Sequence, residues 1–149
     1  LVRGEVPEEE YTLPIGVADV KMEGDDISIV TYGLMLHHCL EAARRMAEEG
    51  VSAEVVDLRT VRPLDQETIL QSVRKTGKCL IAHEDTKAGG IGGEVAAIIS
   101  EHAFEYLDGP VMRLAGPEVP PMPYSPPLEA MFMLDSTKIA DAIRRLAQY

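Results

Sequence analysis

Short apolar runs alternate with longer amphipathic stretches over most of this chain. The short runs are rich in β-branched residues, which is typical of buried strands, and the longer stretches repeat their apolar residues at helical spacing. We expect strands at 27–32, 53–58, 79–82 and 111–115. We expect helices at 36–47, 65–77, 95–107 and 136–147. The predicted fold class is therefore α/β, a three-layer sandwich with a mostly parallel central sheet flanked by helices.

A polar turn, Arg59–Asp65, directly follows the predicted strand 53–58. Within it, Pro63 favours a turn and Asp65 is a suitable cap for the helix that follows. Ligands of open α/β sheets bind beside the loops that follow parallel strands. This stretch is therefore one place to look for function.

Charge and composition exclude several classes of partner. The formal net charge is −11 at pH 7, which argues against nucleic acid and favours a basic protein partner. No stretch approaches the ~20 apolar residues that span a bilayer, and no signal peptide is apparent, so we expect no membrane partner and a cytoplasmic location. Cys39 and Cys79 lie among apolar neighbours, which predicts buried, reduced thiols.

Two segments lack helical or strand periodicity. Residues 1–15 contain prolines and the acidic run Glu8–Glu10, which predicts an interdomain linker or lead-in, followed by one domain over 16–149. The chain begins without Met, so we expect it to be the tail half of a longer protein. Residues 116–127 hold six prolines. We expect them to form an extended surface segment and no helix.

The glycine-rich stretch Gly89–Gly93 raises the alternative of a nucleotide site. Position 95 is valine where a dinucleotide fingerprint needs glycine or alanine, and the stretch follows the third predicted strand instead of the first. No Gly-Lys-Ser/Thr sequence follows. We therefore interpret it as a turn that lets the next helix pack closely.

Other polar clusters carry weaker signals. His37 and His38 are adjacent helix residues that point about 100° apart, so they cannot share one metal ion as an i, i+4 pair would. His83–Asp85 follows a predicted strand, where acid–base chemistry, a solvated cluster and a contact to another chain all remain open. A Gly-x-Ser-x-Gly nucleophile elbow is absent. We expect no catalytic, cofactor-binding or metal-binding residue in this domain.

Several motifs resemble the carboxy-terminal domain of transketolase-like thiamine diphosphate enzymes, particularly the beta subunit of 2-oxo acid dehydrogenases. Asp57–Asp65 resembles the family's D-L-R-T-x-x-P-x-D stretch, and Gly77–Glu84 resembles the strand that leads to its acidic loop. Gly90–Ala97 is similar to its glycine loop and helix start. The most specific match is Gly116–Tyr124, a proline-rich signature of dehydrogenase beta subunits. The lead-in motifs at Glu5–Pro7 and Tyr11–Gly16 extend the resemblance over about residues 5–149.

The resemblance implies that the chain is part of an α2β2 enzyme that decarboxylates a 2-oxo acid. The substrate of such an enzyme would be a branched-chain 2-oxo acid or pyruvate. In that family thiamine diphosphate and magnesium bind between the alpha subunit and the amino-terminal domain of beta, through Gly-Asp-Gly and an Asn pair. This chain contains no asparagine, so we expect the domain to bind no cofactor alone and to be inactive in isolation. The implied role is assembly with the alpha subunit and a second beta subunit, with details closest to the branched-chain type.

The resemblance also implies docking of the peripheral subunit-binding domain of a dihydrolipoyl acyltransferase. Asp108 and the terminal carboxylate on Tyr149 would receive its basic side chains. His83 and Glu84 would lie near the approach to the active site. Two other classes of function remain open from the residues: a free-standing α/β module that binds a small ligand, and a pure protein-interaction module.

Overall fold

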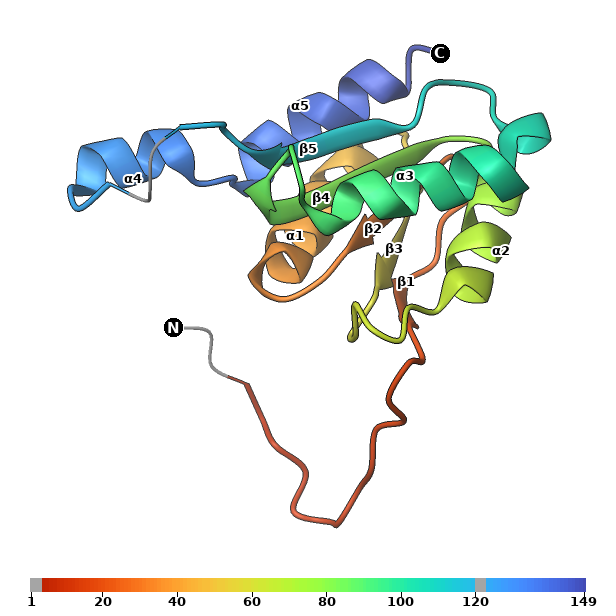
Figure 1. Cartoon of the computed structure of the whole chain (residues 1–149), viewed down its shortest axis with the longest axis horizontal. Helices are drawn as coiled ribbons and strands as arrows, with labels where there is room; N and C mark the ends of the chain where they lie inside the picture. The colour runs from red at the N-terminus through yellow and green to blue at the C-terminus, as the bar shows by residue number, and fades with distance from the viewer. Residues whose placement is uncertain (1–3, 120–122) are drawn as a thin grey trace.

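The computed structural model describes residues 4–119 and 123–149. A five-stranded sheet crosses its centre, with strands in the order β1-β3-β2-β4-β5 (Figure 1). The strands are β1 (Asp19–Met22), β2 (Ile27–Thr31), β3 (Ala53–Asp57), β4 (Cys79–Thr86) and β5 (Met112–Gly116). Strands β3, β2, β4 and β5 are parallel, and β1 runs antiparallel to β3. The predicted, mostly parallel α/β sheet is confirmed.

Helices cover both faces of the sheet (Figure 1). Helices α1 (Leu34–Glu48) and α5 (Ser136–Leu146) pack on one face, around a core that includes Ile29 and Ile143. Helices α2 (Gln66–Thr76) and α3 (Ile91–His102) pack on the other face. The central strands are therefore buried on both sides, which explains why their sequences are mostly apolar.

Two groups of buried polar side chains are paired between the sheet and α2. Ser28 lies fully buried in β2, and its hydroxyl is hydrogen-bonded to those of Ser72 (2.6 Å) and Thr76 (2.7 Å) on α2. Glu54 in β3 is also buried and forms an ion pair with Lys75 of α2. Both contacts tie α2 to the sheet, because a buried polar group without a partner is costly.

The predicted helix ends are confirmed where a cap residue marks them. Asp65 accepts a hydrogen bond from the amide of Thr68 and begins α2, and Gly77 ends this helix at φ 68°. Asp135 caps α5 through the amide of Lys138. Capping depends on a few adjacent residues, so the sequence is sufficient to locate these ends.

Strand β1 was absent from the predicted elements. Its four residues, Asp19–Met22, are too few and too polar for a period to stand out from the lead-in. The strand forms by pairing with β3, where Val20 lies opposite Val56. An ion pair of 2.5 Å between Asp19 and Arg59 holds its beginning to the turn after β3.

The third predicted helix lies earlier in the chain than the predicted range 95–107, since it begins at Ile91. Helix α3 ends at His102, and a 3₁₀ turn, η1 (Phe104–Tyr106), follows. The predicted continuation of this helix to residue 107 is therefore wrong, and neither His102 nor Tyr106 is buried. The reason is a contact with α2: the Arg74 guanidinium lies 5.7 Å from the centre of the Tyr106 ring and donates to the carbonyl of His102.

The proline-rich segment is partly helical. Helix α4 (Pro126–Phe132) begins at two prolines, so the prediction of no helix over 116–127 is wrong at its end. Proline is tolerated in the first turn, where amide groups have no helical partner. The helix projects from the edge of the molecule (Figure 1). The predicted signature residues 120–122 lie outside the described residues.

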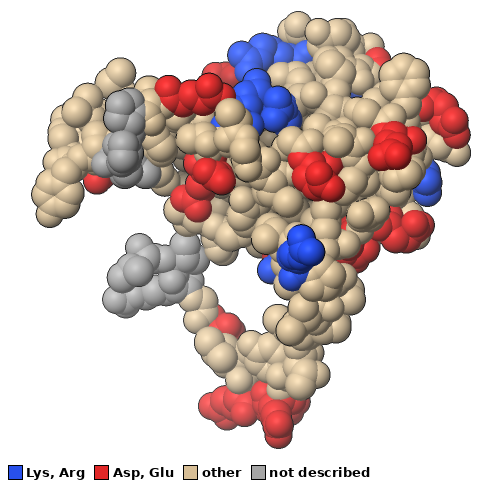
Figure 2. Space-filling model, in the orientation of Figure 1, with Lys and Arg blue, Asp and Glu red and all other residues tan. Residues whose placement is uncertain are grey.

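Residues 4–18 form neither helix nor strand and extend away from the sheet (Figure 1). Figure 2 shows acidic side chains spread over one face of the molecule and gathered at the bend of this extended segment. In the described part of the chain, no helix is long and apolar enough to cross a membrane. Cys39 and Cys79 are buried and unpaired, as predicted, and burial raises the pKa of each thiol to about 12.

Candidate functional site

Asp108 and Tyr149 lie at the end of the sheet where β4 and β5 begin, with Gly109, the residue after Asp108, packed against Tyr149. The amide of Asp108 donates to the carbonyl of Gly77, just before β4, at 2.7 Å. A Cβ added to the neighbouring Gly109 would be 3.1 Å from the Cβ of Tyr149. Tertiary packing thus brings together two residues that are 41 positions apart (149 − 108). We call this region the amino end.

Two hollows flank this pair of residues. The first has a volume of about 720 Å³ and is lined in part by Phe104, which is 73% exposed. The acidic residues Glu105 and Asp108 line the same hollow. The second, of about 430 Å³, is lined by Met112, Arg145, Gln148 and Tyr149. Exposed aromatic side chains beside charged groups are typical of protein-binding surfaces. The amino end therefore has the composition of a docking surface with an acidic side.

His83 and Glu84 lie at the opposite edge of the sheet, which we call the carboxyl end. Strand β4 continues to Thr86, past its predicted end at Ala82, and its register against β5 shifts between Ala82 and Thr86. The carbonyl of Glu84 lies so near Gly116 that a Cβ there would be 2.7 Å away. Irregular pairing of this kind is common beside functional sites because it redirects side chains. Glu84 is exposed.

The imidazole of His83 is completely buried, and neither ring nitrogen has a hydrogen-bond partner in the described residues. It lies directly beneath the first turn of α3. A Cβ at Gly90 would be 2.7 Å from Cε1 of the ring, and a Cβ at Gly92 would collide with Nε2. The prediction that the glycine stretch lets the next helix pack closely is confirmed, and His83 is the side chain on which it packs.

Burial lowers the pKa of His83, because an apolar enclosure disfavours the charged ring. The negative charge of Asp85 opposes this effect, and the positive charge of Arg113 adds to it. At neutral pH the ring is therefore uncharged. Because the ring does not face the solvent, it cannot contact a bound molecule directly. Any effect of His83 on such a molecule would have to pass through the position of the glycine loop above it.

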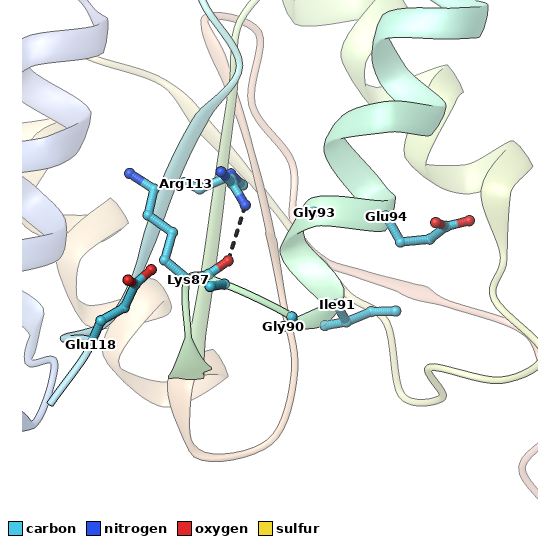
Figure 3. Close-up of a pocket in the computed structure, with 9 residues that line it drawn as sticks. Lys87, Gly90, Ile91, Gly93, Glu94, Arg113 and Glu118 are labelled. Atoms are coloured by element: carbon cyan, nitrogen blue, oxygen red, sulfur yellow. Dashed lines mark hydrogen bonds between the residues drawn. The ribbon is translucent and has the colours of Figure 1, made fainter. Parts of the chain in front are cut away.

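A hollow of about 670 Å³ lies on the outer side of this loop, beside Lys87, Gly90 and Arg113 (Figure 3). Arg113 donates a hydrogen bond of 3.1 Å to the carbonyl of Lys87, which ties β5 to the loop. The side chain of Glu94 points away from this pair (Figure 3). Sequence reasoning missed Lys87 and Arg113, although a charged residue inside a strand, as at Arg113, is itself a signal.

The turn Arg59–Asp65 has a structural role at the same end. The Asp65 carboxylate accepts hydrogen bonds from the amides of Ala18 (2.9 Å) and Thr68 (3.1 Å), and Thr60 accepts one from the amide of Gly16. Partial burial would raise the pKa of Asp65, but these hydrogen bonds lower it below its usual value. The turn therefore fixes the point at which the extended segment enters the domain.

Neither end of the sheet presents an evident metal centre. In the ranges 4–119 and 123–149, no group of three His, Cys, Asp or Glu side chains could hold a metal ion. His37 and His38 lie on α1, away from His83. The residues described thus do not fit the magnesium and diphosphate of a thiamine enzyme, and we assign them no part in holding that cofactor.

Known proteins resemble this chain in sequence over nearly its whole length. The chain is 56% identical to the 2-oxoisovalerate dehydrogenase subunit beta of Bacillus subtilis over 100% of its residues, which is 46% of that protein. It is 45% identical to the mitochondrial pyruvate dehydrogenase E1 component subunit beta of Dictyostelium discoideum, over 95% of this chain and 39% of that protein. The chain therefore spans less than half the length of these relatives.

Structural comparison agrees with the sequence comparison. A split-gene transketolase, solved as an inactive beta4 tetramer, matches with a TM-score of 0.81 and 30% identity, over 97% of this chain and 46% of that one. The sequence profile of the family described as "Transketolase, C-terminal domain" matches residues 16–139. With this match over most of its length, the chain belongs to the transketolase C-terminal domain family.

Proposed function

We propose that this chain is the carboxy-terminal domain of the beta subunit of a thiamine diphosphate-dependent 2-oxo acid dehydrogenase. The observation that carries the proposal is the 56% identity to the beta subunit of a 2-oxoisovalerate dehydrogenase along every residue of the chain. Identity to a pyruvate dehydrogenase beta subunit from the same organism is 45%. The difference supports a branched-chain 2-oxo acid as substrate of the complete enzyme.

In this proposal the domain serves assembly and docking, and thiamine diphosphate and magnesium bind elsewhere in the heterotetramer. The partners are the alpha subunit, a second beta subunit and the peripheral subunit-binding domain of a dihydrolipoyl acyltransferase. Support for assembly comes from apolar side chains left uncovered on α4, where Met131 is 76% exposed. The cytoplasmic location stays a prediction.

The amino end is the proposed docking surface for the acyltransferase. Asp108 is exposed, Glu105 lies in the same hollow, and Tyr149 is 69% exposed beside them. A basic partner would be steered there by the net charge of −11 and would meet carboxylates next to apolar area. Arg145 on α5 lines the adjacent hollow and limits how far the acidic surface extends.

Replacement of Asp108 by Asn in the assembled enzyme tests the docking surface. We expect the affinity for the isolated subunit-binding domain to fall by about 2 kcal/mol or more, which is roughly thirtyfold, with a weaker dependence on salt. Surface plasmon resonance at low and high salt measures both. The matched control is Glu41→Gln on α1, which also removes one exposed negative charge but lies in a separate element.

Replacement of Tyr149 by Ala is a second test of the same surface. It should weaken docking by removing an exposed aromatic ring from the hollow that Tyr149 lines. If Asp108→Asn and Tyr149→Ala both bind as tightly as the parent at either salt concentration, docking takes place elsewhere. The substrate is tested separately, by comparing the assembled enzyme's kcat/KM for branched-chain 2-oxo acids with that for pyruvate.

A further inference from the structure

His83 presents an unusual combination of properties that the proposed docking function does not use. The ring is 0% exposed, and both of its nitrogens lack a hydrogen-bond partner in the described residues. A neutral imidazole always carries one N–H donor, and burying it unpaired costs stability. Buried polar groups of this kind need an explanation, and a role as a switch is one.

Glycine backbone packs closely on the ring from above. Gly90 and Gly92 place the first turn of α3 directly on the imidazole, and any larger residue at either position would overlap it or the carbonyl of Thr86. No side chain of the loop forms a hydrogen bond with either ring nitrogen. The closed arrangement therefore depends on close packing against a neutral ring.

Charged groups surround this contact unevenly. On β4 itself Asp85 favours the charged ring, and on β5 Arg113 disfavours it. The charged residue in the first turn of α3, Glu94, points away from Arg113 and Lys87 (Figure 3). On the β2 side Tyr32 follows the strand, and burial and then Asp85 and Glu84 raise the pKa of its hydroxyl. None of these side chains forms a hydrogen bond with the buried ring. The main chain at Asp85 adds to the effect of its carboxylate in favouring the charged ring.

We propose that His83 is a pH-sensitive latch for the loop Lys87–Gly93, which is closed on the neutral ring and released when the ring is protonated. The charged ring cannot remain unpaired in its enclosure. The protonated ring can reach solvent and pair with the Asp85 carboxylate only if the first turn of α3 moves away. Because Gly90, Gly93 and Arg113 also line the outer hollow, release changes the shape of that hollow.

The direction of the effect follows from linkage between protonation and opening. Burial holds the pKa of His83 below its ordinary value in the closed loop, whereas the open loop allows the ordinary value of about 6.5. The closed state is fully favoured above about pH 6.5, and its advantage declines as the pH falls toward the lowered value. For each unit by which the two pKa values differ, full protonation raises the equilibrium constant for loop opening about tenfold.

Hydrogen exchange of the chain tests this latch. Amides of residues 87–95 should lose protection between pH 7.5 and 5, after correction for intrinsic rates, while amides of β2 keep theirs. His83→Gln should make protection of the loop independent of pH. The matched control, His102→Gln, changes an exposed histidine at the other end of α3 and should behave as the parent.

An NMR titration of the parent's histidine rings gives an answer that does not depend on whether a variant folds. We expect the His83 ring to titrate below the ordinary value for histidine, and the chemical shifts of the Gly90 and Gly92 amides to change over the same pH range. The latch is ruled out if His83 titrates at its ordinary value while loop protection stays constant. It is equally ruled out if a folded His83→Gln variant keeps the parent's pH dependence.

Discussion

The two ends of the sheet place a titratable side chain against a glycine, but with opposite accessibility. At the amino end, a Cβ on Gly77 would collide with the carboxylate of Asp108, which is exposed. At the carboxyl end, a Cβ on Gly92 would collide with the imidazole of His83, which is buried. An exposed carboxylate can rotate into solvent, whereas a ring enclosed by β4 and α3 cannot rotate away from an added methyl group.

This difference teaches what each end is suited to do. The amino end combines mobile charge with uncovered aromatic area, which suits recognition of another protein. The carboxyl end combines rigid packing with an unpaired ring, which suits a response to a change inside the molecule. The same substitution, glycine to alanine, should therefore change the free energy of unfolding by different amounts at the two ends.

The largest effect is expected from Gly92→Ala. The added Cβ meets Nε2 and Cδ2 of a buried ring, so we expect a loss of about 2–3 kcal/mol in the free energy of unfolding, as for overpacked cores. Chemical denaturation measures it. The control is Gly93→Ala, whose Cβ has only Arg113 at 3.6 Å and should stabilise α3 by about 0.5–1 kcal/mol. Equal effects of the two substitutions would contradict the packing on His83.

A smaller loss is expected from Gly77→Ala. This glycine ends α2 at φ 68°, a conformation that costs alanine about 1 kcal/mol, and the Asp108 carboxylate can move aside. We expect a loss of about 1–2 kcal/mol in the unfolding free energy together with weaker docking. A loss as large as that of Gly92→Ala would erase the contrast between the two ends.

Lowering the pH should separate the effect of His83 from the contribution that the Asp65 carboxylate makes to the free energy of unfolding. Because hydrogen bonds lower the pKa of Asp65 in the folded chain, its contribution is present above the unfolded value of about 3.9 and is lost as the pH falls through the folded one. Asp65→Ala should cost about 1 kcal/mol at pH 7. Denaturation curves from pH 7 to 3 should show its share disappearing well below the range in which His83 titrates.

The smallest effect is expected at the edge of the docking surface. Glu105 lines the same hollow as Asp108 but lies on the exposed turn η1. Glu105→Gln should reduce docking affinity by only about 0.2–1 kcal/mol, chiefly through slower association at low salt. Association rates measured at two salt concentrations check this. A loss equal to that of Asp108→Asn would mean that the centre of the surface lies at η1.

Several features could be predicted because they depend on neighbouring residues. The caps Asp65 and Gly77 define helix α2, and the β-branched runs define β2 and β3. The position of His83 against α3 was also within reach, because alternate residues of β4 face opposite layers and Ile81 packs on the side of α2 and α3. The failures at β1 and after His102 arose where distant partners, β3 and Arg74, decide the local structure.

By itself, the sequence determined the α/β class, the strand and helix order from β2 onward, the helix caps and the family resemblance, because these depend on local periodicity and short motifs. Only the tertiary structure decided that Gly109, next to Asp108, packs against Tyr149, that His83 is enclosed without a side-chain partner, and that Gly90 and Gly92 close over it. The physical reason is that burial and proximity are produced by chain segments meeting in space. No local pattern records which segments will meet.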